Sequence, residues 1–92
     1  MNSIYFLNRK NDLRLDKFIK LSRLIKRRTV AKEFCDLGKV SINSKTAKPS
    51  SEVRKGDVLE LDFGTTKLKI SVESLDAGTG KEAAKAMYKE IL

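Results

Sequence analysis

The chain has 92 residues, of which 40% are hydrophobic and one is proline, a composition typical of a single small globular domain rather than a disordered tail. Its longest apolar run, residues 4–7, is far shorter than the roughly 20 residues that span a bilayer and too short for a signal-peptide core. The single cysteine, Cys35, excludes an internal disulfide and fits a reducing compartment. These features predict a cytoplasmic protein with no membrane partner.

Basic residues are concentrated in the first part of the chain. The net charge is +8, from 20 Lys and Arg against 12 Asp and Glu. Residues 1–55 contain 15 basic and 5 acidic side chains, a net charge of +10, whereas residues 56–92 contain 5 and 7, a net charge of −2. This uneven distribution predicts one face at positive potential that attracts a polyanion.

Two short helices are predicted after residues 1–12, which lack a clear period and are expected to form a flexible N-terminal extension. Asp12 is the candidate N-cap of the first helix, and Gly38 is expected to end the second. The expected buried stripes are Leu15, Phe18 and Ile19 in the first helix and Val30, Ala31, Phe34 and Leu37 in the second.

The segment between the helices, residues 22–32, combines five basic residues with apolar ones. Leu24 and Ile25 are expected to pack into the core at the helix junction, so that the basic side chains around them point outward. Such a fixed array loses less side-chain entropy on binding than mobile lysines do.

The apolar period changes from helical to alternating after residue 39. Residues 40–47 predict a hairpin with a turn at Asn43–Ser44, and residues 59–63 and 68–72 predict a second hairpin. A loop is expected over residues 76–80 and a helix over residues 81–92. The order predicts an α+β fold in which two N-terminal helices pack on a small antiparallel sheet and a C-terminal helix follows.

Catalysis is difficult to support from the residues present. The chain has no histidine, the commonest general base and metal ligand, and one cysteine cannot make a zinc site. Cys35 adjoins a buried stripe and is interpreted as a small core residue rather than a nucleophile. We therefore expect a binding protein that is not an enzyme and has no cofactor or metal.

Nucleic acid is the partner that the basic residues favour. Arginine presents a planar fork of donors that matches phosphate oxygens two at a time. The low aromatic content argues against stacking on unpaired bases and favours recognition of the backbone and shape of a folded RNA. The candidate RNA-binding residues are Arg14, Lys17, Arg23, Lys26, Arg27, Arg28 and Lys32.

Three other readings of the charge remain open at this point. A DNA-binding regulator with a helix-turn-helix is one, although Lys32, Glu33 and Asp36 make a poor recognition surface. Binding to a membrane surface is another, but the apolar stripes of the helices are needed for the core. The third is a soluble basic domain with no specific partner.

Several motifs together resemble the S4 RNA-binding domain, whose fold is also called alpha-L-like. The matching residues are Leu13-Arg-Leu-Asp-Lys-Phe18, Arg27-Arg28, Ala31, Gly38-x-Val40-x-Ile42-Asn43 and Val53-x-x-Gly56-Asp57. From Leu13 to the end, the chain is similar to the small stand-alone S4 proteins of the RqcP family. The resemblance divides the chain into the extension, an S4 domain over residues 13–75, and a loop with a C-terminal helix over residues 76–92.

The resemblance implies a monomeric factor of bacterial ribosome-associated quality control. Members of this family bind obstructed 50S subunits, contact 23S rRNA and tRNA, and support the factor RqcH in adding alanine tails to stalled nascent chains. The alternative within S4 proteins is a heat-shock type that recycles 50S subunits carrying peptidyl-tRNA.

The motif match also implies roles for individual residues. Arg14 and Arg28 would be the leading RNA contacts, and replacing either by Ala is expected to abolish 50S binding without lowering the melting temperature. Two positions depart from the family pattern. Arg27 stands where many S4 domains have a Ser or Thr N-cap, and Ser44 stands where glycine is usual in the hairpin turn.

Overall fold

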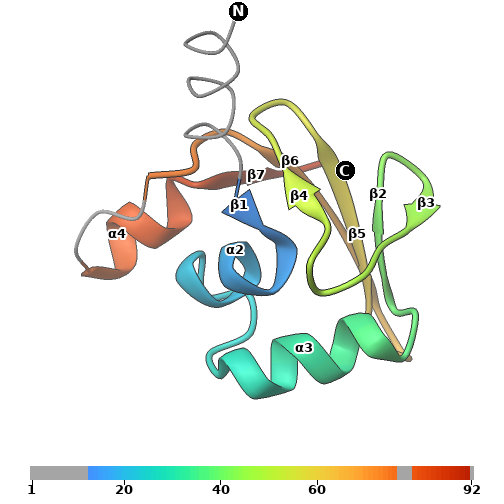
Figure 1. Ribbon diagram of the computed structural model, residues 1–92. Coiled ribbons are helices and arrows are strands. Elements are labelled where there is room, and N and C mark those ends of the chain that lie inside the picture. The colour runs from blue at the N-terminus through green and yellow to red at the C-terminus, as the bar shows by residue number, and fades with distance from the viewer. Residues whose placement is uncertain (1–12, 77–79, 92) are drawn as a thin grey trace, which may run out of the picture.

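The computed structural model describes residues 13–76 and 80–91, and Figure 1 shows the path of the chain. Five strands form one antiparallel sheet in the order β3-β2-β5-β6-β7, while β1 pairs with β4 in a separate two-stranded sheet. The elements in chain order are β1 (Leu13–Arg14), α2 (Leu15–Leu21), α3 (Arg28–Asp36), β2 (Val40–Ile42), β3 (Lys45–Thr46), β4 (Glu52–Val53), β5 (Val58–Asp62), β6 (Lys67–Val72), α4 (Gly80–Lys85) and β7 (Tyr88–Glu90).

The core lies between the helices α2 and α3 and the inner face of the larger sheet (Figure 1). Removing apolar side chains from water in this way stabilises a fold by about 1.5–3 kcal/mol for each large residue. This arrangement confirms the predicted packing of two helices on an antiparallel sheet. The fully buried residues include Leu15, Phe18 and Ile19 of α2, Ala31 of α3, and Val40, Leu59, Leu61 and Ile70 of the sheet.

The start of α2 differs from the prediction. The N-cap is Arg14, which makes no side-chain capping bond, and Asp12 lies outside the described residues. The first helical N–H groups, those of Leu15 and Asp16, donate instead to the backbone carbonyls of Ser51 (2.7 Å) and Pro49 (3.1 Å). The prediction of Asp12 as the cap was wrong because these distant carbonyls satisfy the donors that a cap would have satisfied.

Helix α3 ends as predicted. The N–H of Gly38, at φ 73°, donates to the Cys35 carbonyl (2.9 Å), and the N–H of Lys39 donates to the Phe34 carbonyl (3.2 Å). These two bonds form a Schellman motif, which needs a residue with positive φ and therefore favours glycine. At the other end of the helix Arg27 is the N-cap and makes no side-chain capping bond, in line with its departure from the usual Ser or Thr.

The apolar stripe of α3 is narrower than predicted. Ala31 and Cys35, four residues apart, face the core, whereas Val30 is 41% exposed and Leu37 is 69% exposed. The prediction placed Val30 and Leu37 in the core and was wrong. Only one face of a helix packs against the core, and these two residues lie outside that face. Leu24 and Ile25 do pack against the core at the helix junction, as predicted.

The β2–β3 hairpin closes with two residues of positive φ, Asn43 at 50° and Ser44 at 72°. This pattern is typical of a type I′ turn, in which Asn is common at the first position and Gly at the second. Ser44 adopts the conformation that glycine would adopt without steric cost. The turn nevertheless keeps its register, with Ile42 opposite Lys45.

Asn43 also joins this hairpin to the start of β5. Its side-chain Oδ1 accepts from the Val58 N–H (2.9 Å), and its Nδ2 donates to Asp57 Oδ1 (3.2 Å). The other carboxylate oxygen of Asp57 accepts from the backbone N–H of Arg54 (2.9 Å), across the turn at Gly56. We call this group of Asn43, Asp57 and Val58 the asparagine turn.

The C-terminal segment corrects the predicted helix over residues 81–92. Among residues 80–91 only α4 is helical, and Tyr88 then pairs with Val72 as β7 joins the sheet. Strand β6 would otherwise leave an unpaired edge of backbone donors and acceptors, so pairing overrides the helical preference of this segment. Met87 is fully buried, and its carbonyl accepts from the Glu73 N–H (2.9 Å).

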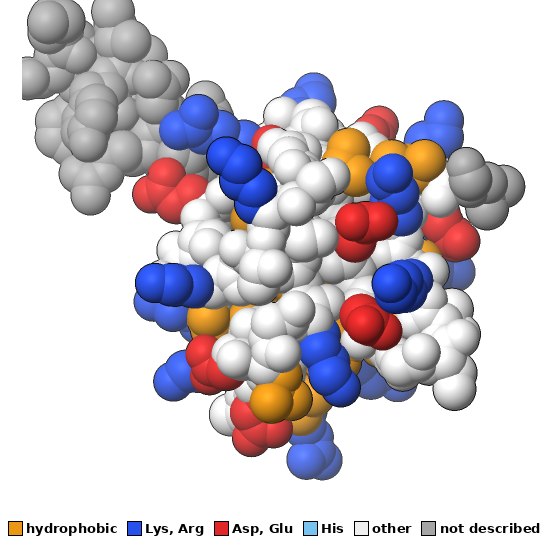
Figure 2. All heavy atoms as spheres, turned by 90° about the vertical axis from the view of Figure 1, so that its right-hand side faces the viewer, with side chains coloured by type: hydrophobic (Ala, Val, Ile, Leu, Met, Phe, Trp, Pro, Cys, Tyr) orange, Lys and Arg blue, Asp and Glu red, His pale blue; other side chains and the backbone are white. Residues whose placement is uncertain are grey.

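Figure 2 turns toward the viewer the side of the molecule on which the β2–β3 hairpin lies. Basic and acidic side chains are interspersed on this side, with small apolar areas between them. This side of the molecule therefore does not carry the positively charged face that the sequence predicts.

Candidate nucleic-acid interface

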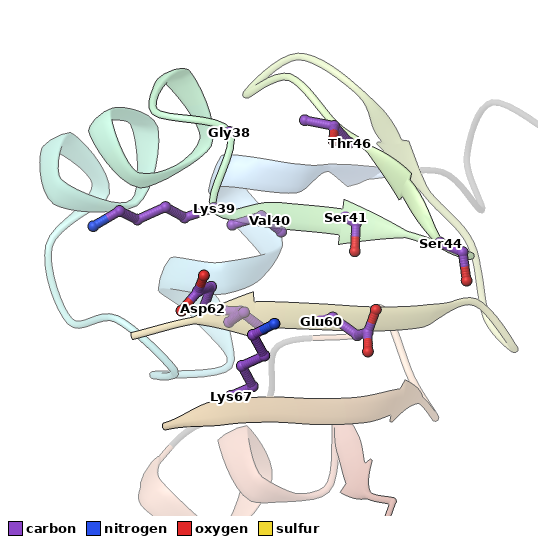
Figure 3. A pocket seen from close by; sticks show the side chains of 10 residues that line it. Gly38, Lys39, Val40, Ser41, Ser44, Thr46, Glu60, Asp62 and Lys67 are labelled. Carbon is purple, nitrogen blue, oxygen red and sulfur yellow. The ribbon is translucent and has the colours of Figure 1, made fainter. Parts of the chain in front are cut away.

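A first hollow, about 230 Å³ in volume, lies over the outer face of β2 and β5 (Figure 3). Glu60 and Asp62 line it together with Lys39 and, from the neighbouring strand, Lys67 (Figure 3). Two carboxylates balance the two ammonium groups, so the hollow has no net positive charge to attract a polyanion. This hollow is therefore not the predicted binding face.

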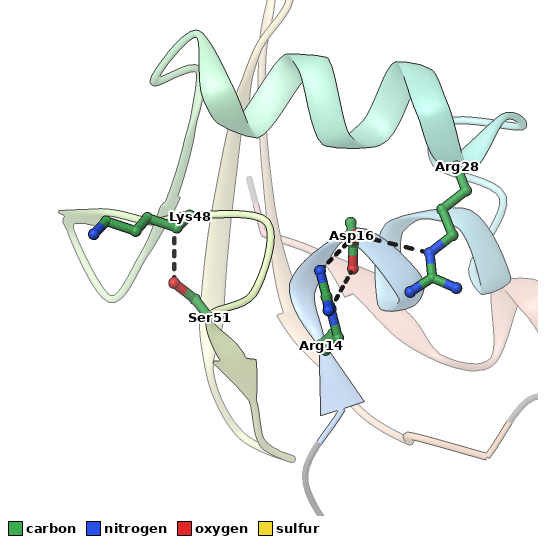
Figure 4. A network of polar contacts seen from close by, with 5 residues as sticks. All are labelled: Arg14, Asp16, Arg28, Lys48 and Ser51. Carbon is green, nitrogen blue, oxygen red and sulfur yellow. Dashed lines mark hydrogen bonds and ion pairs between the residues drawn. The ribbon is translucent and has the colours of Figure 1, made fainter.

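The helices carry a different arrangement, centred on one buried acid (Figure 4). The side chain of Asp16 is only 3% exposed, and it lies between Arg14 at the start of α2 and Arg28 at the start of α3. Arg14 Nε and Nη2 donate to the two carboxylate oxygens at 3.3 Å each, and Arg28 Nε lies 3.7 Å from Asp16 Oδ2. We call these three residues the arginine site.

Both arginines remain available to a ligand. Their side chains are 52% and 51% exposed, although each is held by the buried carboxylate. Asp16 thus brings together the leading RNA contacts predicted from the sequence, one from the end of β1 and one from the first residue of α3. Asp16, a residue of the motif that resembles the S4 domain, thus forms a salt bridge with each of them.

The other five predicted residues are also exposed, but they are not gathered at Asp16. Lys32 lies one helical turn after Arg28 on α3, and Lys17 lies on α2. The remaining three, Arg23, Lys26 and Arg27, lie along the connection between the helices. They flank the arginine site along the chain rather than completing it.

A second hollow, of about 510 Å³, opens between α3 and the loop that joins β3 to β4. Arg14 lines it from β1, Lys32 from α3 and Lys48 from the loop. The loop is held in place because the Asp16 N–H donates to the Pro49 carbonyl and the Lys48 N–H donates to Ser51 Oγ (2.9 Å). We call this the basic hollow.

Lys48 is the residue that the sequence analysis missed. It lies 34 positions after Arg14 in the chain, so charge clustering along the sequence gave no sign that both residues line one hollow. A usable signal was its neighbourhood, since Lys45 begins the short strand β3 and Lys48 follows that strand directly before Pro49. A basic loop beside a basic helix can add contacts to the same phosphate backbone.

Cys35 lies behind the basic hollow and is 3% exposed, which confirms its interpretation as a small core residue. Burial in the core, with lesser contributions from the negative charges of Asp16 and Asp36, raises the pKa of its thiol to about 11. The thiol is therefore protonated near neutral pH and unsuited to nucleophilic chemistry.

Within residues 13–76 and 80–91, no three His, Cys, Asp or Glu side chains are grouped in a way that could hold a metal ion. Over the same residues, no helix has the length and apolar character needed to cross a membrane.

The fold and its sequence motifs define the class of protein, a small domain of the RNA-binding S4 type. The family model for the S4 domain matches residues 13–59, just over half of the chain, and the chain belongs to the S4-domain family. Individual proteins of this family are similar to the chain over most of its length. The RQC P-site tRNA stabilizing factor of Bacillus subtilis is 53% identical over 83% of this chain and 88% of the relative.

Two further comparisons extend this result. The protein of the same name from Streptococcus pneumoniae is 44% identical over 86% of this chain and 90% of its own. Among solved structures, the trimeric structure of Vibrio cholerae heat shock protein 15 superposes with a TM-score of 0.80 at 32% identity. That superposition covers 87% of this chain and 82% of the Vibrio chain.

Proposed function

We propose that this chain is a ribosome-associated quality control factor that binds obstructed 50S subunits through 23S rRNA and peptidyl-tRNA. The observation that carries the proposal is the 53% identity, over most of both chains, to a relative named for stabilising a P-site tRNA. Relatives of the same name in Listeria and Streptococcus support a ribosome-associated, RNA-binding role.

The geometry of the arginine site agrees with this role. Two half-exposed guanidinium groups, one from the residue before α2 and one from the first residue of α3, can contact neighbouring phosphates of one RNA backbone. Lys32 and Lys48 extend the positive charge into the basic hollow. The exposed face of α3 is poorly suited to reading DNA bases, because the acids Glu33 and Asp36 accompany Lys32 where a recognition helix would present donors to the groove.

Sedimentation of a cell extract through sucrose tests the binding step. We expect the chain to migrate with free 50S subunits and to be released from them by high salt, because phosphate contacts weaken as salt rises. Retention on DNA with no 50S peak would overturn the proposal in favour of a DNA-binding regulator.

The finer proposal is that the bound factor supports RqcH-dependent alanine tailing of stalled nascent chains. The second candidate is recycling of 50S subunits that carry peptidyl-tRNA, which the structural similarity to heat shock protein 15 favours. Deleting the gene separates the two. Loss of alanine tails supports the first function, whereas intact tails with an accumulation of 50S-bound peptidyl-tRNA support the second.

The proposed factor is a cytoplasmic, non-catalytic monomer. The trimer described for the Vibrio protein makes the oligomeric state worth measuring in this chain. Light scattering should give a mass near the 10.4 kDa of one chain, and a mass near three times that value would contradict the monomer.

A further inference from the structure

Asp16 is an acidic residue at the centre of a surface that otherwise attracts phosphate. Its carboxylate is nearly fully buried, and a buried charge is unfavourable unless it is paired and hydrogen-bonded. Within the part of the chain that the structure describes, its side-chain partners are Arg14 and Arg28. Asp16 thus forms ion pairs with the two leading residues of the candidate interface.

The contacts leave the outer edges of both guanidinium groups free. Arg14 uses Nε and Nη2 toward Asp16, which occupies two of its five N–H donors. Arg28 approaches through Nε, so its terminal nitrogens point away from the carboxylate (Figure 4). Each arginine is held from one side and presents further donors on the other.

We infer that Asp16 is a positioning residue for RNA binding, which fixes Arg14 and Arg28 so that their free N–H groups face the phosphate backbone. The inference rests on the proposed function and adds a residue that need not touch RNA. Its physical basis is that an arginine already held in one orientation loses less conformational entropy on binding.

Simple electrostatics predicts the opposite effect for this residue. Removing the negative charge raises the net charge from +8 to +9, which by itself strengthens attraction to phosphate. If Asp16 positions the arginines, its neutral variant binds more weakly despite the added positive charge. The sign of the change therefore separates the two accounts.

The first test compares Asp16→Asn with Asp36→Asn. Asp36 is exposed, lines the same basic hollow and forms no ion pair with another described residue, so its variant makes the same charge change without freeing an arginine. We expect Asp16→Asn to bind purified 50S subunits about tenfold more weakly than wild type, and Asp36→Asn to bind equally or slightly more tightly. Equal or tighter binding by Asp16→Asn overturns the inference.

The second test uses the wild-type chain and does not depend on whether Asp16→Asn folds. Nitrogen-15 relaxation of arginine Nε–H groups, measured without RNA, should show restricted motion for Arg14 and Arg28 and fast motion for the exposed Arg23. Equal mobility at all three arginines overturns the inference. If the wild-type chain fails to bind 50S subunits at all, the proposed function fails, while the relaxation result still tests the positioning.

Discussion

The arginine site and the asparagine turn both contain motif residues of the S4 resemblance, but the buried acid of the first and the partly exposed acid of the second have opposite kinds of partner. Asp16 holds two charged side chains that stay half-exposed, so its partners remain available to a ligand. In the asparagine turn, Asn43 and Asp57 satisfy the backbone N–H groups of Val58 and Arg54. The difference leads us to expect that one motif serves the proposed interface while the other fixes the register of the fold.

The largest expected effect is that of the double variant Arg14→Ala/Arg28→Ala. It leaves the Asp16 carboxylate buried without a counter-charge, which should lower the free energy of unfolding by about 2–3 kcal/mol and abolish 50S binding. From the sequence alone, we expected these substitutions to abolish 50S binding without lowering stability. The salt bridges to Asp16 add the expected loss of stability. Urea denaturation and co-sedimentation measure the two effects.

The control for this variant adds Asp16→Asn to the same background. Neutralising the buried acid should restore part of the lost stability, because the uncompensated charge is gone, but it cannot restore binding. A triple variant no more stable than the double variant would show that the arginines stabilise the fold through packing rather than by pairing with Asp16.

Asn43→Ala should produce the opposite pattern. It removes the acceptor of the Val58 N–H and the donor to Asp57, and it leaves alanine at a positive φ, so we expect a loss of about 1–2 kcal/mol in unfolding free energy. RNA affinity measured on the folded protein should not change. Weakened 50S binding in a folded Asn43→Ala protein would break the distinction between the two regions.

The adjacent position offers a matched control for that turn. Ser44→Gly places glycine at φ 72°, where it fits without strain, and should raise the unfolding free energy by about 0.5–1 kcal/mol. The same urea measurement checks it, and a loss of stability would contradict the assignment of the turn type.

A smaller effect on both properties is expected at Arg23. This residue has φ 60° just after α2, a position where glycine is favoured, so Arg23→Gly should raise the unfolding free energy by about 0.5–1 kcal/mol. Removing its charge should lower 50S affinity by about threefold if it contacts phosphate. Higher stability with unchanged 50S affinity would show that Arg23 is not part of the interface.

Local patterns predicted the parts of this fold that depend on neighbouring residues. The buried stripe of α2 and the glycine that ends α3 follow from spacing and from the φ that a Schellman motif needs. The C-terminal strand β7 was missed because its residues have helical spacing and only the open edge of β6 makes a strand favourable. Long-range pairing of this kind leaves no local pattern.

The candidate site shows the same limit. The basic residues near both helix starts could be selected from charge and from family resemblance, but the meeting of Arg14 and Arg28 at one acid depends on how α2 packs on α3. Lys48 reaches the basic hollow only because the backbone of its loop is bonded to the start of α2. These are tertiary contacts, for which a single sequence gives no direct signal.

The smallest expected effect concerns Lys48, which lines the basic hollow without contacting Asp16. An exposed lysine that neutralises one phosphate contributes to affinity mainly through counterion release, so Lys48→Ala should weaken 50S binding about two- to fourfold at moderate salt. The slope of log K against log salt should become less steep by about one unit. Lys89, exposed on β7 and outside the basic hollow, provides the matched control, and Lys89→Ala should leave both quantities unchanged. Equal losses for the two variants would mean that binding senses only total charge, and the basic hollow would then not extend the arginine site.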